Sequence, residues 1–329
     1  MSREVILEGR NLVKFFPHGK KGLLGRPESQ VQAVDDVSVV LHKGETLGIV
    51  GESGCGKSTL ARVLTRLIEP TQGSILLDGQ DITHAKGRDL RHLREDVQII
   101  FQDPYSSLNP RHSVGEIIAT PLRIQKKQLP NGEKARVQDL MDLVGLNPEH
   151  FNRYPHEFSG GQRQRIGIAR ALSLDPRVIV ADEPVSALDV SIQAQILNLL
   201  ERLQHDLGLS FIFIAHDLSV VRHIADEVAV MYLGKIVERA TAASLYSSPR
   251  HPYTKALLSA VPVANPGLGR KRQRIVLRGD VPSPINPPPG CRFAARCWKA
   301  EDLCRSSEPA LVDQGNGSLV ACHFPEIGN

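Results

Sequence analysis

The sequence predicts an α/β fold in which a largely parallel sheet presents its chemistry at the carboxyl ends of the strands. Short aliphatic runs rich in β-branched residues recur along the chain, and each ends abruptly in polar residues. Segments with the apolar period of a helix lie between these runs. Strands that alternate with helices in this way are typical of a parallel sheet covered by helices.

Four aliphatic runs predict buried parallel strands. Each run leads into a candidate functional segment: GESGCGKST, Gln102, the pair Asp182 and Glu183, and His216. Since ligands of open α/β sheets bind outside the carboxyl ends of the strands, we expect these segments to converge on one crevice. The runs are TLGIV at 46–50, VQIIF at 97–101, VIVA at 178–181 and FIFIA at 211–215. A helix with Ser191 as its N-cap and Gly208 as its stop is predicted between the last two.

The stretch after the first strand fits the phosphate-loop pattern G-x-x-x-x-G-K-[ST]. Its backbone N–H groups would surround phosphates, Lys57 would reach the β- and γ-phosphates, and the Ser58 hydroxyl would ligate Mg²⁺. A chance glycine loop is disfavoured because a strand precedes the motif and an aliphatic helix follows it. Cys55 is interpreted as a small filler rather than a nucleophile. The expected nucleotide-binding residues here are Gly51, Ser53, Gly54, Cys55, Gly56, Lys57, Ser58 and Thr59.

Two carboxylates follow the third strand, and the sequence assigns them different tasks. Asp182 would hold Mg²⁺, and Glu183 would accept a proton from the attacking water. The alternative is a pair of ordinary acids at a strand end, which the preceding phosphate loop disfavours. His216 is a candidate donor to the γ-phosphate, although a lone histidine at a strand end is usually structural. Gln102 is the weakest candidate when it is taken alone.

Composition limits the classes of function. With 329 residues the chain exceeds the size of most single cores, so one large domain and an appendage are expected. A net charge of +4, evenly spread, argues against a nucleic-acid partner, and the basic run 269–278 is interpreted as a solvated linker. The sequence shows neither a secretory signal nor an apolar run of about 20 residues, which predicts a cytoplasmic location.

Four cysteines crowd into the last forty residues. Cys291, Cys297, Cys304 and Cys322 are separated by five, six and seventeen residues, unlike the C-x₂-C pairs of zinc ribbons. In a reducing compartment such a group predicts a metal or cluster site rather than disulfides. Unligated buried thiols are the alternative.

Taken in order, GESGCGKST, Gln102, FSGGQ, VIVADEP, SALD and His216 resemble the nucleotide-binding subunit of an ABC transporter. The resemblance implies a P-loop NTPase with a RecA-like core, an antiparallel β subdomain and a helical subdomain at about 104–175. It makes Gln102 a magnesium ligand that also contacts the membrane subunits, and Phe16 or its rival Phe15 the ring on adenine. Asp189 would line a dimer seam. The signature residues Ser159, Gly160, Gly161 and Gln162 would bind the γ-phosphate held by the opposite subunit.

The resemblance implies an ABC ATPase nucleotide-binding domain at 1–260 and a C-terminal extension at 261–329. The extension narrows the resemblance to one subfamily of these transporters. Its HPYT, PPPGC and four-cysteine elements are similar to those of the oligopeptide and dipeptide importer subfamily. This implies ATP, Mg²⁺ and a [4Fe–4S] cluster, with Zn²⁺ as the alternative. It also implies a second, related ATPase subunit, two transmembrane permease subunits and, indirectly, a peptide-binding protein at the cytoplasmic membrane. Importers of nickel or glycosides and a non-transport ABC ATPase are the alternatives.

Overall fold

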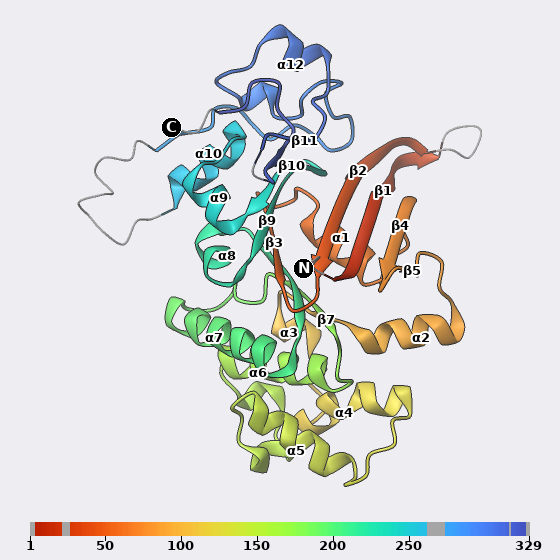
Figure 1. Cartoon of the computed structure of the whole chain (residues 1–329). Helices are drawn as coiled ribbons and strands as arrows, with labels where there is room; N and C mark the ends of the chain where they lie inside the picture. Colours follow the sequence, from red (N-terminus) through yellow and green to blue (C-terminus); the bar gives the residue numbers. More distant parts are fainter. Residues whose placement is uncertain (1–3, 22–26, 262–273, 316, 327–329) are drawn as a thin grey trace. The chain divides into compact units, whose positions relative to one another are not determined.

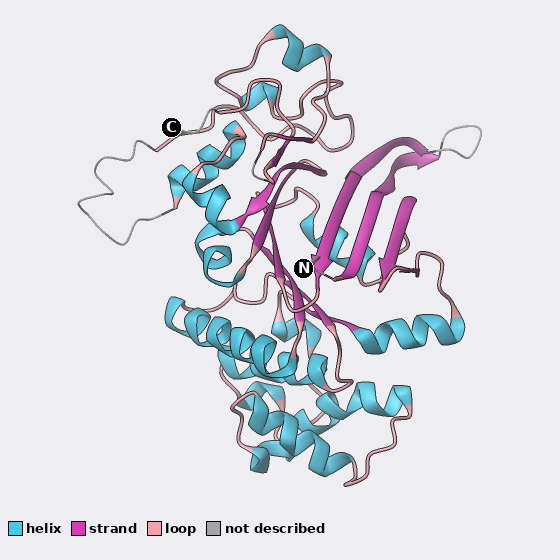
Figure 2. Cartoon of the chain, in the orientation of Figure 1, coloured by secondary structure: helices cyan, strands magenta, loops and turns pink. Residues whose placement is uncertain are grey.

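The computed structural model describes residues 4–21, 27–261, 274–315 and 317–326. Figures 1 and 2 show the helices and strands of the chain. They fall into two compact units, each made of several segments of the sequence. The first comprises residues 1–7, 41–45 and 77–214, and the second comprises 8–40, 46–76 and 215–329. The first half of the basic run, 269–273, lies outside the described residues.

In the first unit, three parallel strands form the sheet. The strand β7 (Val178–Asp182) lies between β6 (Val97–Ile100) and β8 (Ser210–Ala215), and Val178 is paired with both Val97 and Ser210. Every residue of β7 and β8 is buried, as expected for strands with helices on both faces. The three strands predicted here are confirmed, and their shared direction places Gln102 and Glu183 after neighbouring strands.

All regular elements that the structure describes between residues 104 and 172 are helices. Within this segment α4 packs on both α5 and α6. Helix α6 in turn packs on α7, which follows β7. The helices of the unit are α2 (Gly87–Asp96), α3 (Pro104–Ser107), α4 (Val114–Gln125), α5 (Glu133–Leu143), α6 (Gly160–Leu172) and α7 (Val190–Leu207); the 3₁₀ turns are η1 (Pro148–Asn152) and η2 (Pro155–Glu157).

The predicted boundaries of α7 need one correction. Asp189 occupies the N-cap position, so the helix begins at Val190 and the predicted N-cap Ser191 lies inside it. The Asp189 side chain makes no capping hydrogen bond. Gly208 ends the helix with φ 64°, the left-handed conformation for which glycine was expected. The apolar stripe from Ile196 to Leu203 is buried, whereas Leu207 at its end is largely exposed.

The second unit contains β3 (Thr46–Val50), which pairs in parallel with β9 (Glu227–Tyr232). β10 (Lys235–Thr241) continues antiparallel to β9, and β12 (Leu319–Val320) and β11 (Val312–Asp313) follow at the edge. A separate sheet has β1 (Val5–Lys21) between β2 (Pro27–His42) and β4 (Gln72–Leu77), and β5 (Gln80–Asp81) beyond β4. Thus the last strands of the chain extend the sheet that carries the phosphate loop.

The helices of the second unit cover its sheet. Helix α8 contacts β3, and α9 contacts β10. The helical elements of this unit are α1 (Lys57–Leu64), α8 (Leu218–Ile224), α9 (Ala242–Ser247), α10 (Pro252–Ala260), α12 (Asp302–Ser306) and the 3₁₀ turn η3 (Ala294–Arg296). Among the described residues, no helix is both long and apolar enough to cross a membrane.

Candidate nucleotide site and cysteine cluster

The predicted phosphate loop runs from the end of β3 to the first turn of α1. The Lys57 side chain is almost fully buried, and its Nζ donates to the carbonyls of Gly51 at 2.8 Å and Glu52 at 3.0 Å. An ammonium group held over loop carbonyls at a helix N-terminus is suited to an anionic ligand, because the helix dipole adds positive charge there. The described geometry is therefore that of a phosphate cradle.

Glycine at position 56 is required by both conformation and space. Gly56 has φ 109° and serves as the N-cap of α1. A Cβ there would lie 2.0 Å from the carbonyl oxygen of Ala33, closer than any real contact. Gly54 has φ 78°, but a Cβ on it would meet nothing within 4 Å. The loop thus has two crowded glycines of positive φ, Gly51 and Gly56, and one open glycine, Gly54.

Cys55 is buried beneath the loop, and its Sγ lies 3.9 Å from Lys57 Nζ. Burial raises the pKa of its thiol, which keeps the sulfur protonated near neutral pH. The Cys55 carbonyl accepts a 2.8 Å hydrogen bond from the N–H of Gly234. These contacts agree with its interpretation as a filler residue.

The acidic strand end joins two of the predicted site residues. Asp182 ends β7 and is 4% exposed, whereas Glu183 leaves the strand with φ 46°. The Glu183 N–H donates to the carbonyl of Ile214 on β8 at 3.0 Å. Gln102, after β6, donates from Nε2 to Glu183 Oε2 at 3.0 Å. The structure therefore brings Gln102 and Glu183 into direct contact.

The predicted signature segment begins α6 with a reciprocal capping box. The Ser159 hydroxyl accepts from the N–H of Gln162 at 3.3 Å, and Gln162 Oε1 accepts from the N–H of Ser159 at 3.0 Å. Both side chains are exposed. Gly161 is instead buried, and a Cβ on it would lie 2.6 Å from Ile192 of α7. Its missing side chain thus serves helix packing, a reason that the glycine pair alone did not indicate.

Three further predicted residues lie on exposed surface. Asp189 and His216 are exposed, and Asp189 caps α7 without a side-chain capping bond. On β1, Phe16 is 37% exposed with the Lys14 Nζ 5.3 Å from its ring centroid, whereas Phe15 is half-buried. Greater exposure leaves the Phe16 ring more available for stacking on a base.

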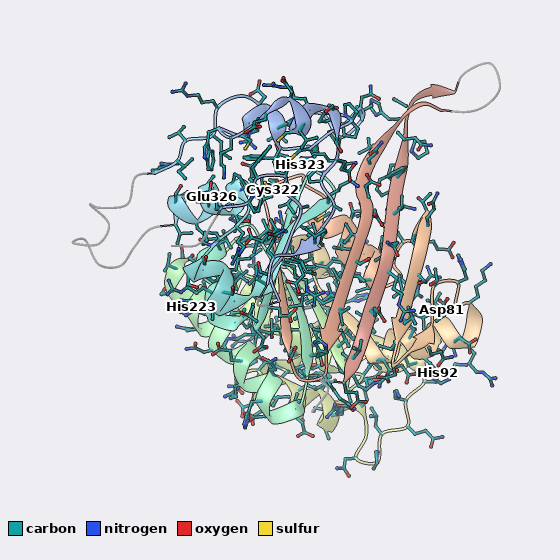
Figure 3. The ribbon with its side chains drawn as sticks, turned by 45° about the horizontal axis from the view of Figure 1, so that its top comes forward. Asp81, His92, His223, Cys322, His323 and Glu326 are labelled. Carbon is teal, nitrogen blue, oxygen red and sulfur yellow. The ribbon has the colours of Figure 1, made fainter. Side chains whose placement is uncertain are left out.

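The four C-terminal cysteines line one small cavity together with Phe293 and His323. Cys322 and His323 are labelled in Figure 3, near Glu326. Burial raises the pKa of the Cys291 and Cys297 thiols and brings that of Cys322 to about 11. Among the described residues, no group of three or more His, Cys, Asp or Glu is arranged to hold a metal ion. The described part of the chain therefore does not show the predicted [4Fe–4S] or zinc ligand set.

Sequence reasoning missed the residues that fix Glu52, the second residue of the phosphate loop. Its N–H donates to the Tyr253 hydroxyl at 2.9 Å, and its carboxylate accepts two bonds from Arg296, at 2.7 and 3.1 Å. Arg296 lies 244 residues further along the chain. No periodicity or short motif signals a contact at that separation.

The chain was compared with known proteins. A family described as ABC transporter matches residues 34–186, and one described as oligopeptide/dipeptide transporter, C-terminal region, matches residues 237–304. The dipeptide transport ATP-binding protein DppF of Haemophilus influenzae is 54% identical over 317 residues, covering 96% of each protein. The oligopeptide transport ATP-binding protein AppF of Bacillus subtilis is 53% identical, covering 98% of each. The dimeric ATP-binding cassette MJ0796, solved with ADP and Pi, has a TM-score of 0.64 and 27% identity, and the match covers 72% of this chain and 99% of that one.

Proposed function

We propose, from the premise that this chain belongs to the ABC transporter family as an ATP-binding subunit of the oligopeptide/dipeptide type, that it hydrolyses ATP to drive peptide import. Membership rests on 53–54% identity over nearly the whole chain to ATP-binding proteins of peptide transport, which confirms the resemblance read from the sequence. The observation that carries the function is the pairing of two features in one chain. One is the phosphate loop with Lys57 held over it, and the other is the C-terminal region matched at residues 237–304.

ATP with Mg²⁺ is the nucleotide that this family membership implies. In our proposal the loop N–H groups and Lys57 bind the phosphates, while Ser58, Asp182 and Gln102 hold the magnesium ion. Bound magnesium would neutralise charge that develops on the phosphate oxygens. Phe16 would stack on the adenine ring. The position of Lys57 supports this assignment, because the Gly51 and Glu52 carbonyls hold its Nζ at the loop, at 2.8 and 3.0 Å.

Glu183 is proposed as the group that takes the proton from the attacking water. A base must lie within hydrogen-bond reach of that water and be held in a fixed orientation. The amide of Gln102 contributes to that orientation by donating to Glu183 Oε2 at 3.0 Å. His216 is proposed to donate to the γ-phosphate.

We further propose that hydrolysis requires a pair of ATPase subunits. The start of α6, with Ser159, Gly160, Gly161 and Gln162, would bind the γ-phosphate held by the phosphate loop of the second subunit. Asp189 would lie at the same seam. The dimeric cassette MJ0796 supports this arrangement by its similarity. Closure around ATP and opening after hydrolysis would then move the membrane partners.

The partners follow from the same premise. We propose a second, related ATPase chain, two transmembrane permease subunits contacted through the helical segment and Gln102, and a peptide-binding protein that acts on those permeases. The protein would then lie at the cytoplasmic face of the membrane, attached through its partners. The ATPase does not touch the cargo, so the peptide assignment is supported by the relatives alone.

Reconstitution tests this function. The chain is copurified with transmembrane permease subunits and placed in vesicles with ATP. We expect ATP-dependent uptake of labelled dipeptides or oligopeptides, and none with a Lys57→Ala chain. Uptake of nickel or glycosides without uptake of peptides would assign another cargo, and failure to copurify with any permease would favour a non-transport ATPase.

For the cysteine cluster we propose a [4Fe–4S] group held by Cys291, Cys297, Cys304 and Cys322. Its support is that the four thiols line one cavity. A cluster spreads its thiolates over four irons, whereas a single zinc ion needs donors about 2.3 Å from one point. Anaerobic purification should give a brown protein with absorbance at about 400 nm. A colourless protein with or without bound zinc would contradict the cluster.

A further inference from the structure

We propose that the cysteine-flanked segment 291–297 clamps the phosphate loop, so that the C-terminal extension sets the affinity for nucleotide. The sequence of this segment is CRFAARC, with Arg292 after the first cysteine and Arg296 before the last. Arg296 contacts the loop directly, and Arg292 contacts the turn that supports the loop. The proposal rests on nucleotide binding at the phosphate loop and concerns how that binding is maintained.

The first point is Glu52. The Arg296 guanidinium makes a two-pronged ion pair with its carboxylate, at 2.7 and 3.1 Å. The Arg296 side chain is 9% exposed and that of Glu52 is 28% exposed, so solvent screens this pair only in part. The carboxylate also raises the pKa of Arg296, which keeps the guanidinium charged. The pair is therefore a defined contact and differs from the mobile pairs of an open surface.

Glu52 is held by its backbone as well. Its N–H donates to the Tyr253 hydroxyl of α10, and its carbonyl accepts from Lys57 Nζ at 3.0 Å. The carboxylate of Glu52 thus pairs with the C-terminal extension, its N–H with α10, and its carbonyl with Lys57 of the loop itself. Since the Glu52 carbonyl is one of the two that hold Lys57, moving Glu52 would displace the ammonium group that is to meet the phosphates.

The second point is Cys55, in the middle of the loop. Arg292 Nη1 donates to the carbonyl of Leu233 at 2.5 Å, and the next residue, Gly234, donates its N–H to the Cys55 carbonyl. Arg292 also pairs with Asp35, whose N–H donates to the Gly234 carbonyl. The turn between β9 and β10 is thereby fixed from both sides and supports the loop.

A buried aromatic core joins the two arginines. Phe293, between them in sequence, packs against Tyr232 and Tyr253, with ring centroids 5.3 and 5.4 Å away. Both tyrosines and Phe293 are almost completely buried. A tightly packed core transmits displacement because its side chains have few alternative arrangements. A shift of Cys291 or Cys297 would consequently move Arg292 and Arg296 with it.

The test measures the Kd of Mg·ATP for the isolated full-length chain and does not rely on turnover. Arg296→Met keeps the length of the side chain and removes its charge. If the loop then holds its binding conformation for about a tenth of the time, the Kd rises about tenfold. Arg305→Met is the matched control, because Arg305 lies in the same extension and, among the described residues, its ion pair is with Asp302 of its own helix. It should leave the Kd unchanged.

A double-mutant cycle connects the effect to the contact. Glu52→Gln should weaken binding similarly, and adding Arg296→Met to it should have little further effect, since both changes break one interaction. Wild-type Kd values for Arg296→Met and Glu52→Gln, or fully additive effects, would overturn the clamp. If Arg296→Met does not fold, Glu52→Gln and Tyr253→Phe decide in its place. Failure of the unaltered chain to bind Mg·ATP would instead refute the proposed function.

Discussion

Gln102 and Glu183, which follow neighbouring parallel strands, are joined by a hydrogen bond of 3.0 Å from the amide Nε2 to the carboxylate Oε2. Glu183 sits at φ 46°, where its N–H donates to β8. A non-glycine residue in this conformation is uncommon, and its side chain is directed by the turn that it makes. Backbone and amide together thus fix the carboxylate that is proposed to accept the proton of water.

Replacing that carboxylate should separate binding from chemistry. Glu183→Gln keeps the size of the side chain but lowers its basicity, so turnover should fall by about 10² or more while ATP still binds. Steady-state phosphate release and equilibrium nucleotide binding measure the two quantities. A normal rate of phosphate release would remove Glu183 from the role of base.

Removing the amide should have a smaller effect. Gln102→Ala leaves the carboxylate in place without its donor, and we expect a decrease of about tenfold in turnover, as for the loss of one orienting contact. Gln98→Ala is the matched control, because Gln98 lies on β6, the strand that precedes Gln102, and its amide bonds to the Arg94 carbonyl instead. Equal losses of turnover in both variants would mean that the Gln102 amide has no specific effect on Glu183.

The start of α6 offers a test of pairing between subunits. Ser159→Arg places a bulky charge on an exposed N-cap, so the Kd of the isolated chain for Mg·ATP should stay nearly unchanged while turnover is abolished. Loss of the cap costs about 1 kcal/mol, which a thermal melt would register separately. Weaker nucleotide binding by the monomeric variant would contradict the assignment of Ser159 to the opposite site.

Two glycines of the phosphate loop distinguish crowding from backbone conformation. Both Gly54 and Gly56 have positive φ, so alanine strains the backbone at either position by about 1 kcal/mol. Only Gly56→Ala also forces a Cβ against the Ala33 carbonyl. We expect Gly56→Ala to abolish Mg·ATP binding and to lower the melting temperature. Gly54→Ala should weaken binding and lower the melting temperature only slightly. Similar behaviour of the two would show that conformation alone matters.

The buried His251 predicts a loss of stability in mild acid. Burial lowers its pKa from 6.5 to about 3, so the folded chain binds fewer protons than the unfolded chain between these values. Stability contributed by the neutral ring is present above pH 6.5 and decreases as the pH falls toward 3. At pH 5 the loss is about 2 kcal/mol.

Urea unfolding of the wild type and of His251→Gln at pH 8 and pH 5 measures this contribution. The variant should be less stable at pH 8 but lose less on acidification. Glu238 faces the same turn and accepts the His251 N–H, and burial raises the pKa of its carboxyl, which acts in the opposite direction in both proteins. His205→Gln, at an exposed position, is the control. Equal acid sensitivity of His251→Gln and wild type would contradict the prediction.

Local sequence signals predicted the strands and the phosphate loop because each depends on neighbouring residues. Aliphatic runs identify buried strands, and the spacing from Gly51 to Ser58 identifies the loop. The contact between Glu52 and Arg296 could not be predicted in this way, since it depends on how a distant turn packs on buried aromatic rings. Likewise, the packing role of Gly161 depends on the approach of α7.

The pairing of β12 with β10 has a consequence for shortened chains. Glu238 and Arg239 of β10 are paired with Val320 and Leu319 of β12. The last strands of the chain therefore cover an edge of the sheet that contains β3. A protein cut after residue 260 would leave the backbone N–H and C=O groups of β10 bare, a template on which another molecule can add a strand. Such a truncation should self-associate and precipitate at concentrations where the intact chain stays dispersed.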